Sequence, residues 1–582
     1  MGDDASAGPT PPLRRLARGL PWAVVPAVLA GLVLEQARWV RESTSETYDE
    51  YTYLVMGDCI ARRGDFASLA SPMTPPLPIW LEYALPARSI AVEFGTDAYR
   101  RATPGLVRRA RFLTAIGAGV PLVWLAFAWV GRRRGWVAGA IGGGLAALSP
   151  TVLAAASIAT TDACFACFGV LALAALAWYR DRPGPGRYLA LGGALGLALA
   201  SKQSAAVLAP AVGLELLLRG LPTRRPGWTA VDVGLRVGWR VTTRLAGLVG
   251  LAFLTSWALY GFRNARYGVL GTSSTLPVVV PMVAGLLPGG EAIVEAARGW
   301  GMPLAVDTFV GQMGHAAEGH DAFLMGMHSR EGWWSFFPVA LAIKSTPAEL
   351  ALLALALGLA CRPATWRDPS RRIWLVAGLA MLGAGMASRI NIGQRYMLLV
   401  YPLAILLGAD WLANGSGRRR RWGLAAGGLL LAGQAVAAWG IAPHYLAYFN
   451  PLIGGPMQGH RYLVDSSLDW GQDLPALRRL LEARHYRLVT LGYFGTAQAD
   501  VHGIRAVDWR TRDDAAAARA DYLAVSATTL MGAYGGLDDL YDRFKDFPSE
   551  RAGYSIFVYN LADPRIRAAW DDLRRAGRPD GP

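Results

Sequence analysis

The sequence has few charged residues for its length. Only 17% of its 582 residues are Asp, Glu, Lys or Arg, and 53% are hydrophobic, whereas soluble proteins carry roughly 25% charged residues. At about 150 residues per domain, this length would correspond to about four soluble domains. That little polar surface cannot cover four water-soluble globules. Much of the chain must therefore face lipid.

Cysteines and nucleotide-binding motifs are also scarce. Four cysteines in a chain of this length exclude a disulfide framework. Cys164 and Cys167 lie in an apolar run with no second pair to complete a zinc site, so we interpret them as core residues. No GxGxxG motif follows a strand-like segment, and no P-loop is present. We therefore expect no nucleotide cofactor.

Lysine is almost absent, although the chain is basic. The net charge is +15, and Lys and Arg together number 58, yet Lys occurs only at positions 202, 344 and 545. In a soluble protein this positive charge would suggest binding to nucleic acid. In a membrane protein it is typical of arginine-rich cytoplasmic loops.

Long apolar segments make up much of the sequence. A bilayer-spanning helix needs about 20 mostly apolar residues, and about eleven segments approach this pattern. They are Leu20–Val40, Phe112–Val130, Trp136–Ala156, Ala163–Trp178, Tyr188–Ala200, Ala205–Leu218, Leu245–Phe262, Phe336–Ala360, Ile373–Ala387, Tyr396–Leu412 and Trp422–Ile441. Several are short, so some pairs are expected to be tilted or re-entrant.

Arginines predict the orientation of these segments. Arg14, Arg15 and Arg18 precede the first segment and should stay in the cytoplasm. Counting onward, every connection expected in the cytoplasm is basic. These connections are residues 131–135, 179–187, 219–244, 361–372 and 413–421. We therefore expect a multi-pass protein of the plasma (inner) membrane with a cytoplasmic N-terminus.

Three segments are then expected on the outer face: residues 41–111, 263–335 and 442–582. The last has the composition of a soluble domain. Its predicted elements are strands at Arg487–Phe494, Tyr522–Ser526 and Tyr554–Tyr559 and a helix at Leu474–Arg484. The predicted fold is an α-helical polytopic membrane domain, residues 1–441, followed by a small extracytoplasmic α/β domain, residues 442–582.

Acidic residues near the predicted outer face are the first candidates for function. Asp49 and Glu50 follow the first span and could supply a general base and an acceptor ligand, or could belong to a solvated loop. Asp162 stands at the start of the fourth span, where it could cap the helix. Alternatively, Asp162 and Asp49 could share a divalent cation.

Two of the rare lysines, Lys202 and Lys344, also lie in apolar surroundings near that face. A lysine is a compact point charge that suits a narrow phosphate pocket. Alternatively, both could snorkel to the interface. Thr346, Pro347 and Glu349 predict that a helix begins just after Lys344, with amides available to an anion.

The remaining candidates have weaker patterns. His315, Glu318, His320, Asp321 and His328 cluster in the sequence, but their spacing fits no zinc motif, so a surface or interfacial role is favoured. Arg389 and Arg395 flank a short outer turn, where they could bind phosphate or lie among lipid headgroups.

Seven motifs occur in order and at plausible spacing along nearly the whole chain. They are YDEYTYLVMGDCIARRGDF, TPPLPIWL, ATTDACFACFGVLALAALAWY, LGLALASKQSAAVLAP, FLMGMHSREGWWSFFPVALAIKSTP, QRYMLLVYPL and HYLAYFNPLIGGPMQGHRYLVDSSLDWGQDL. With them the chain resembles the GT-C superfamily of polyprenyl-phosphate-sugar-dependent glycosyltransferases. It is most similar to the bacterial protein-O-mannosyltransferase-like group (glycosyltransferase family 39 type), and also resembles the aminoarabinose transferases.

The resemblance implies transfer of a hexose or pentose, with inversion, from a polyprenyl-phosphate carrier at the outer face. The acceptor would be a hydroxyl group of a protein, lipid or glycan. Roles carried over by motif position are as follows: Asp49 as general base, Glu50 as acceptor ligand, Asp162 as second acid, Lys202, Lys344, Arg395 and Tyr396 at the donor phosphate, and Asp49, Asp162 and His320 as ligands of a possible divalent metal ion.

The chemistry is consistent with this resemblance. A hydroxyl acceptor needs a base within hydrogen-bond reach, and the leaving phosphate needs fixed positive charge or helix amides. The alternative function is a polytopic transporter or flippase of lipid-linked sugars, in which membrane-depth charges also occur. Transporters usually contain two related halves, but the Asp-Glu and Thr-Asp motifs have no second copy.

Overall fold

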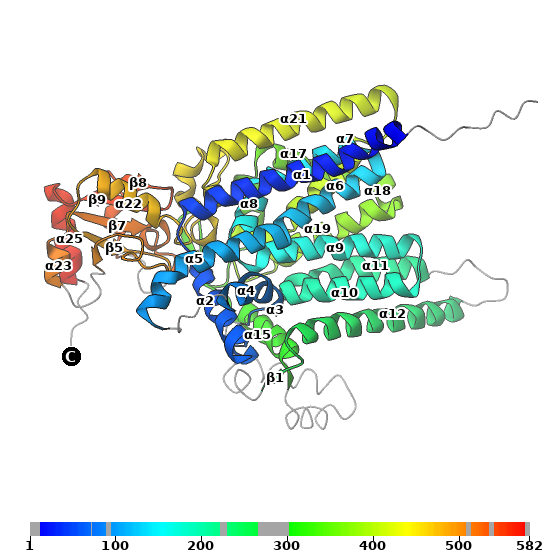
Figure 1. The fold of residues 1–582 in the computed structure, drawn as a ribbon, viewed down its shortest axis with the longest axis horizontal. Helices are drawn as coiled ribbons and strands as arrows, with labels where there is room; N and C mark the ends of the chain where they lie inside the picture. Colours follow the sequence, from blue (N-terminus) through cyan, green and yellow to red (C-terminus); the bar gives the residue numbers. More distant parts are fainter. Residues whose placement is uncertain are drawn as a thin grey trace, which may run out of the picture.

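The computed structural model describes residues 12–70, 73–88, 95–220, 230–265, 302–507, 514–534 and 540–576. Long helices run side by side in a bundle that carries a sheet-containing domain at one end (Figure 1). Helix α1 (Pro12–Ser43) begins at the opposite end of the bundle and runs toward that domain. The predicted outer segment 263–335 lies partly outside the described residues, because 266–301 are not among them.

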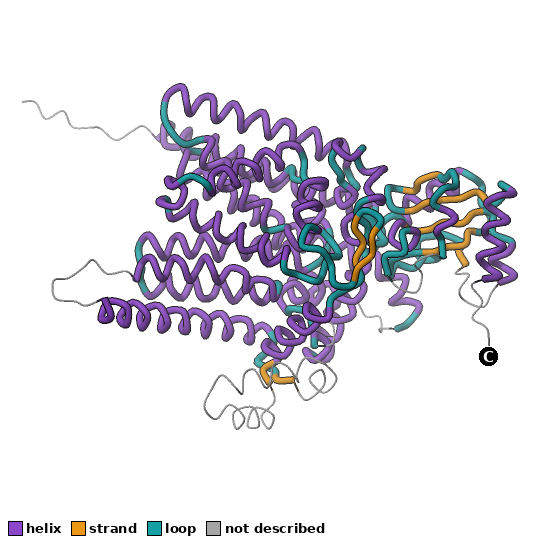
Figure 2. The backbone as a smooth tube through the Cα atoms, turned by 180° about the vertical axis from the view of Figure 1, so that it is seen from behind, coloured by secondary structure: helices purple, strands orange, loops and turns teal. Residues whose placement is uncertain are grey.

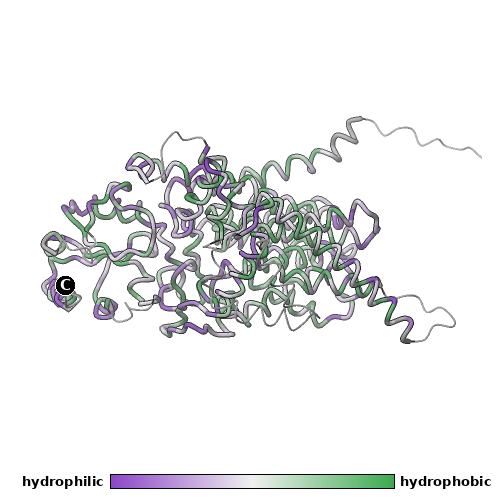
Figure 3. Tube along the Cα trace, turned by 90° about the horizontal axis from the view of Figure 1, so that it is seen from below, coloured by the Kyte–Doolittle hydropathy of each residue, from purple (hydrophilic) through white to green (hydrophobic). Residues whose placement is uncertain are grey.

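All eleven predicted apolar segments coincide with helices of the bundle. Besides α1, these helices are α5 (Asp97–Thr114), α6 (Val120–Arg134), α7 (Trp136–Ala147), α8 (Pro150–Ser157), α9 (Thr161–Asp181), α10 (Pro185–Ser201), α11 (Ala209–Gly220), α12 (Ala230–Leu259), α16 (Phe336–Lys344), α17 (Pro347–Ala360), α19 (Pro369–Met386), α20 (Val400–Leu412) and α21 (Gly417–Ile441). A short helix, α18 (Pro363–Arg367), joins α17 to α19. Figure 3 shows that the bundle is largely hydrophobic, with hydrophilic segments gathered toward its ends and in the sheet domain.

Helix length and hydropathy give the candidate membrane spans. Among the described residues, six helices are long and apolar enough to cross a bilayer, or seven if the bent pair α7 and α8, which meet at 63°, forms one span. Helices such as α10, with 17 residues, fall short of this length, since a span needs about 20 residues. The chain is a multi-pass membrane protein, but the prediction of eleven spans is not confirmed.

Buried ion pairs hold the end of the bundle that lies away from the sheet domain. Asp410 contacts Arg133 at 3.0 Å, and Arg134 and Arg371 at 2.8 Å each. Glu215 contacts Arg372 at 2.7 Å. These arginines come from connections whose basic character predicted a cytoplasmic location.

Shorter elements surround the other end of the bundle. They are α2 (Tyr48–Asp58), α3 (Pro76–Pro78), α4 (Leu85–Arg88), the strand pair β1 (Asn264–Ala265) and β2 (Met302–Pro303), α15 (Leu304–Glu318) and the hairpin β3 (Ala322–Leu324)–β4 (Met327–Ser329). Figure 2 shows this hairpin beside the sheet domain. The segment after α1 is fixed to that domain, because Ser45 N–H donates to Gln472 and Tyr48 N–H donates to Trp470, both at 2.9 Å.

The C-terminal domain contains a mixed five-stranded sheet in the order β6-β5-β7-β9-β8. Its strands are β5 (Val489–Gly492), β6 (Ala506–Val507), β7 (Tyr522–Ser526), β8 (Glu550–Ala552) and β9 (Ile556–Asn560), and its helices are α22 (Leu474–Ala483), α23 (Asp514–Ala518), α24 (Ala527–Leu530) and α25 (Pro564–Ala576). Strands β5, β6 and β7 are parallel, whereas β9 is antiparallel to β7 and β8. The predicted α/β character is confirmed, although the short edge strands β6 and β8 were not predicted.

Candidate functional site

Four segments meet at the end of the bundle nearest the C-terminal domain, and each is interrupted there. Helices α2 and α9 begin after extended residues, Thr47 and Thr160. Lys202 adopts an extended conformation between α10 and the 3-10 helix η5 (Gln203–Leu208). Another 3-10 helix, η6 (Gln394–Met397), lies just before α20. Interrupted helices expose polar groups at membrane depth only where a cavity or protein surrounds them.

These interruptions bring four charged side chains into one alternating chain. Asp49 Oδ2 lies 2.9 Å from Arg395 Nη1, which lies 3.6 Å from Asp162 Oδ2. The other oxygen of Asp162 accepts a hydrogen bond from Lys202 Nζ at 2.5 Å. The sequence predicted each of these residues separately, and the structure joins them in the order acid, base, acid, base.

Two aromatic rings lie against the cations of this chain. The ammonium group of Lys202 is 4.2 Å from the centre of the Tyr396 ring. The guanidinium group of Arg395 is 4.1 Å from the centre of the Trp470 ring. Both distances are within the range of cation–π attraction. These ring contacts add to the ion pairs that hold the two cations in place.

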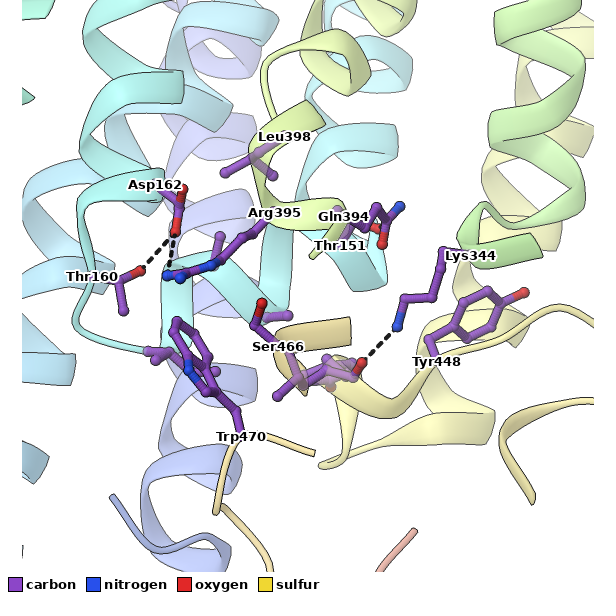
Figure 4. Close-up of a pocket in the computed structure, with 15 residues that line it drawn as sticks. Thr151, Thr160, Asp162, Lys344, Gln394, Arg395, Leu398, Tyr448, Ser466 and Trp470 are labelled. Atoms are coloured by element: carbon purple, nitrogen blue, oxygen red, sulfur yellow. Dashed lines mark hydrogen bonds and ion pairs between the residues drawn. The ribbon is translucent and has the colours of Figure 1, made fainter. Parts of the chain in front are cut away.

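A small cavity opens beside this chain of charges. Asp162, Arg395 and Trp470 lie on one side of it, and Lys344 lies on the other (Figure 4). The remaining lining residues are Thr151, Ala154, Ala155, Ile158, Thr160, Gln394, Leu398, Tyr445, Leu446, Tyr448 and Ser466. The cavity is therefore apolar along much of its wall and cationic at two positions.

The ammonium group of Lys344 is already held by contacts within the protein, unlike that of a lysine that is free to bind phosphate. Its ammonium group donates to the carbonyl oxygens of Leu446, at 2.7 Å, and Ser467, and lies 4.3 Å from the centre of the Phe449 ring. The predicted capping box is present, since Thr346 accepts from the Glu349 amide and Glu349 accepts from the Thr346 amide. This box occupies two of the amides that the sequence had suggested for an anion.

Glu50, for which the resemblance implies the role of an acceptor ligand, is buried in the structure. Its side chain is fully buried and forms an ion pair with Arg111 at 2.6 Å. Its carboxylate also accepts hydrogen bonds from the amides of Thr47 and Ala159, both at 2.8 Å. A carboxylate so enclosed is a structural anchor, and the adjacent Asp49 is the acid that is partly exposed.

The residues predicted to bind a metal ion do not form a metal centre. Asp49 and Asp162 are both close to Arg395, whose positive charge occupies the position between them. His320 instead bonds to the Asp321 carbonyl and packs against the rings of His315 and Tyr534. In the part of the chain that the structure describes, no group of three His, Cys, Asp or Glu side chains could hold a metal ion.

Sequence reasoning missed the contribution of the segment before α22. Trp470 covers Arg395, and Asp465 accepts a hydrogen bond from the Tyr534 hydroxyl group. Burial raises the pKa of Asp465 to about 6 and that of Asp469 to about 7. The motif DSSLDWGQDL was visible in the sequence, but nothing in it indicated which of its residues reach the bundle.

Comparison with known proteins gives a family match for part of the chain. Residues 106–231 match the family described as dolichyl-phosphate-mannose-protein mannosyltransferase, which confirms the sequence resemblance over that segment. No curated protein matches the chain.

Several solved structures have low-scoring similarity to the chain, among them the following two. One is ArnT from Cupriavidus metallidurans bound to undecaprenyl phosphate: identity is 14%, coverage is 93% of this chain and 98% of ArnT, and the TM-score is 0.43. The other is the oligosaccharyltransferase of Archaeoglobus fulgidus in complex with Zn and sulfate, with 14% identity, coverage of 88% and 69%, and a TM-score of 0.41.

The burial of Glu50 predicts a structural effect. The change Glu50→Gln leaves Arg111 as an uncompensated buried charge, which typically costs about 3–5 kcal/mol. We expect a lower midpoint of thermal unfolding for the full chain in detergent. Glu35→Gln is the control, because Glu35 pairs with Arg38 at an exposed site, and it should leave the midpoint nearly unchanged. Equal midpoints for the two variants would contradict the anchoring role.

Proposed function

We propose that this chain is an integral-membrane glycosyltransferase. It transfers a sugar from a polyprenyl-phosphate carrier to a hydroxyl acceptor at the outer face of the membrane, with inversion. The observation that supports this most directly is the ion pair between Asp49, a partly exposed acid, and Arg395, a cation at the edge of a cavity. A base and an anion-binding group are thus adjacent.

In the proposed reaction, the acceptor oxygen forms a bond to the anomeric carbon while the bond from that carbon to the phosphate oxygen breaks. Asp49 takes the proton of the hydroxyl group, which is too weak an acid to ionise alone. Arg395 and Lys202 stabilise the negative charge that develops on the departing polyprenyl phosphate. Asp162 contacts both cations and fixes their positions.

Donor binding and base activation are linked in this scheme. Without donor, Arg395 is bonded to Asp49, and a paired carboxylate is a poor base. The phosphate of the donor is a diester with one negative charge, and it can form bidentate contacts with arginine. When the donor phosphate binds to Arg395, the Asp49 carboxylate is released toward the acceptor.

An apolar groove of about 1,050 Å³ provides a place for the polyprenyl chain. It is lined by residues of α16, α17, α19 and α20, among them Leu341, Ala342 and Leu403. Leu357 and Leu379 at the groove are 56% and 37% exposed, so it opens to the outside of the bundle. Helix α16 contributes Leu341 to this groove and Lys344 to the cavity, which would bring a bound chain close to the cations.

The proposed orientation has the C-terminal domain and the site on the outer face. The arginines predicted to be cytoplasmic, including Arg133 and Arg371, lie at the end of the bundle opposite the C-terminal domain. An excess of arginine in short loops favours the cytoplasmic side. This arrangement supports a cytoplasmic N-terminus.

The first test removes the proposed base. In a strain that lacks this chain, mass spectrometry would identify the glycan that is lost, and the wild-type chain should restore it. Asp49→Asn should reduce the restored glycan about 10²- to 10⁴-fold, the usual contribution of a general base. The protein level in the membrane should not change. Asp97→Asn, an exposed acid of the same outer segment, is the control. Full restoration by Asp49→Asn would refute the assignment.

The second test asks whether Lys202 contributes to donor binding. Lys202→Gln removes a cation from the charge chain and should weaken binding of polyprenyl phosphate to the purified full chain about tenfold or more, the loss expected for a charged hydrogen bond. Lys545→Gln is the matched control, because Lys545 lies in the C-terminal domain and pairs with Asp542. Unchanged affinity in Lys202→Gln would argue against a phosphate at this position.

A third test fills the groove. A Cβ atom at Gly378 would meet only Leu403, at 3.9 Å, so Gly378→Phe should project into the groove without backbone strain. We expect weaker binding of polyprenyl phosphate, while the affinity for a phosphate without a lipid tail stays the same. Gly383→Phe on the same helix, where nothing lies within 4 Å, is the control. If both variants bind polyprenyl phosphate normally, the polyprenyl chain does not bind in this groove.

A further inference from the structure

A second large cleft, of about 1,050 Å³, lies between the bundle and the C-terminal domain. Its walls come from the end of α1, from α5 between Arg101 and Arg111, and from the helix α22. This cleft shares no lining residue with the cavity beside Arg395. It is a separate site, and the proposed reaction does not use it.

The cleft has an excess of positive charge. Six arginines and three glutamates line it, together with His502. Each glutamate already has a basic partner: Glu42 pairs with Arg38, Glu46 with His502 and Glu482 with Arg478, at 2.7–2.8 Å. Among the lining arginines, Arg111 is neutralised by the buried Glu50.

Four lining arginines remain: Arg41, Arg101, Arg108 and Arg479. Within the described residues, none of them has a carboxylate partner among the ion pairs found. Arg101 and Arg108 are two helical turns apart on α5 and so project from one face of it, while Arg479 comes from α22 across the cleft. Planar guanidinium groups on facing walls can bind oxyanions such as phosphate through bidentate hydrogen bonds.

The position of the cleft suggests where its ligand comes from. Helices α1 and α5 belong to the candidate spans Gly19–Ser43 and Asp97–Arg134, so the cleft lies where these spans approach the C-terminal domain. A membrane boundary is the level at which lipid phosphates are found. The opening is also polar enough to admit a soluble phosphate compound.

We propose that this cleft binds a phosphate-bearing anion, held between α5 and α22 by Arg101, Arg108 and Arg479. The ligand would bridge the bundle and the C-terminal domain, which already meet beside the cleft through the Glu46–His502 pair. Its binding would strengthen the contact between the two parts of the chain, since a ligand that contacts both stabilises the docked arrangement.

The experiment measures binding to the full chain in detergent, in a Lys202→Gln background that weakens the proposed donor site. The probes are short-chain phosphatidylglycerol and inorganic diphosphate. The double variant Arg101→Gln/Arg479→Gln should raise the Kd of at least one probe about tenfold, as expected for lost charged hydrogen bonds. The double variant Arg484→Gln/Arg519→Gln removes the same charge from the C-terminal domain outside the cleft and should leave Kd unchanged.

The two probes distinguish the sources of the phosphate. Saturable binding of phosphatidylglycerol alone identifies a lipid headgroup, and binding of diphosphate, with or without the lipid, identifies a soluble phosphate compound. Arg101→Lys/Arg479→Lys should retain part of the affinity because it keeps the charge but loses the bidentate geometry. Equal Kd values in the cleft and control variants, or no saturable binding of either probe to the parent chain, would overturn the proposal.

Discussion

The structure around the candidate site depends on one chain of charged side chains, which can be buried only because each acid is paired with a cation. A single ionised group at membrane depth costs several kcal/mol unless it is paired or solvated. Asp162 is only 2% exposed, and it is compatible with burial because Lys202 and Arg395 both contact it. The two partners, Lys202 and Arg395, are more than 190 residues apart in the sequence. The helices that carry them therefore cannot shift relative to one another without exposing an unpaired charge.

Glu50 supports the geometry of this chain of charges through its own buried contacts. Its carboxylate bonds to the Ala159 amide, three residues before Asp162, and to Arg111 on α5. Asp49, the residue before Glu50, contacts Arg395 together with Asp162, while its own side chain stays partly exposed. The two adjacent acids therefore differ in burial. The contact of Trp470 with Arg395 adds the C-terminal part of the chain to the same assembly.

The sequence predicted the parts of this site better than their connections. Apolar segments, the capping box after Lys344 and the central strands could be predicted because each depends on neighbouring residues. The scarcity of lysine singled out Lys202. The pairing of Arg395 with both Asp49 and Asp162 could not be predicted, since it joins residues far apart in the sequence. The same holds for Glu50, whose partner Arg111 is set by how α5 packs. The prediction of eleven spans is not confirmed, because hydropathy identifies apolar helices without measuring whether each crosses the membrane.

The unequal burial of the two acids suggests the order of events in the proposed reaction. Arg395 contacts both, but the Asp49 side chain is 25% exposed and the Asp162 side chain 2%. Displacing Asp162 would leave a buried charge and would also release Lys202, whereas displacing Asp49 only moves a carboxylate toward water. An incoming phosphate should therefore replace Asp49 on Arg395 and leave Asp162 in place. The base then becomes available only after the donor has bound, so an acceptor hydroxyl group is activated only when a sugar is present to receive it.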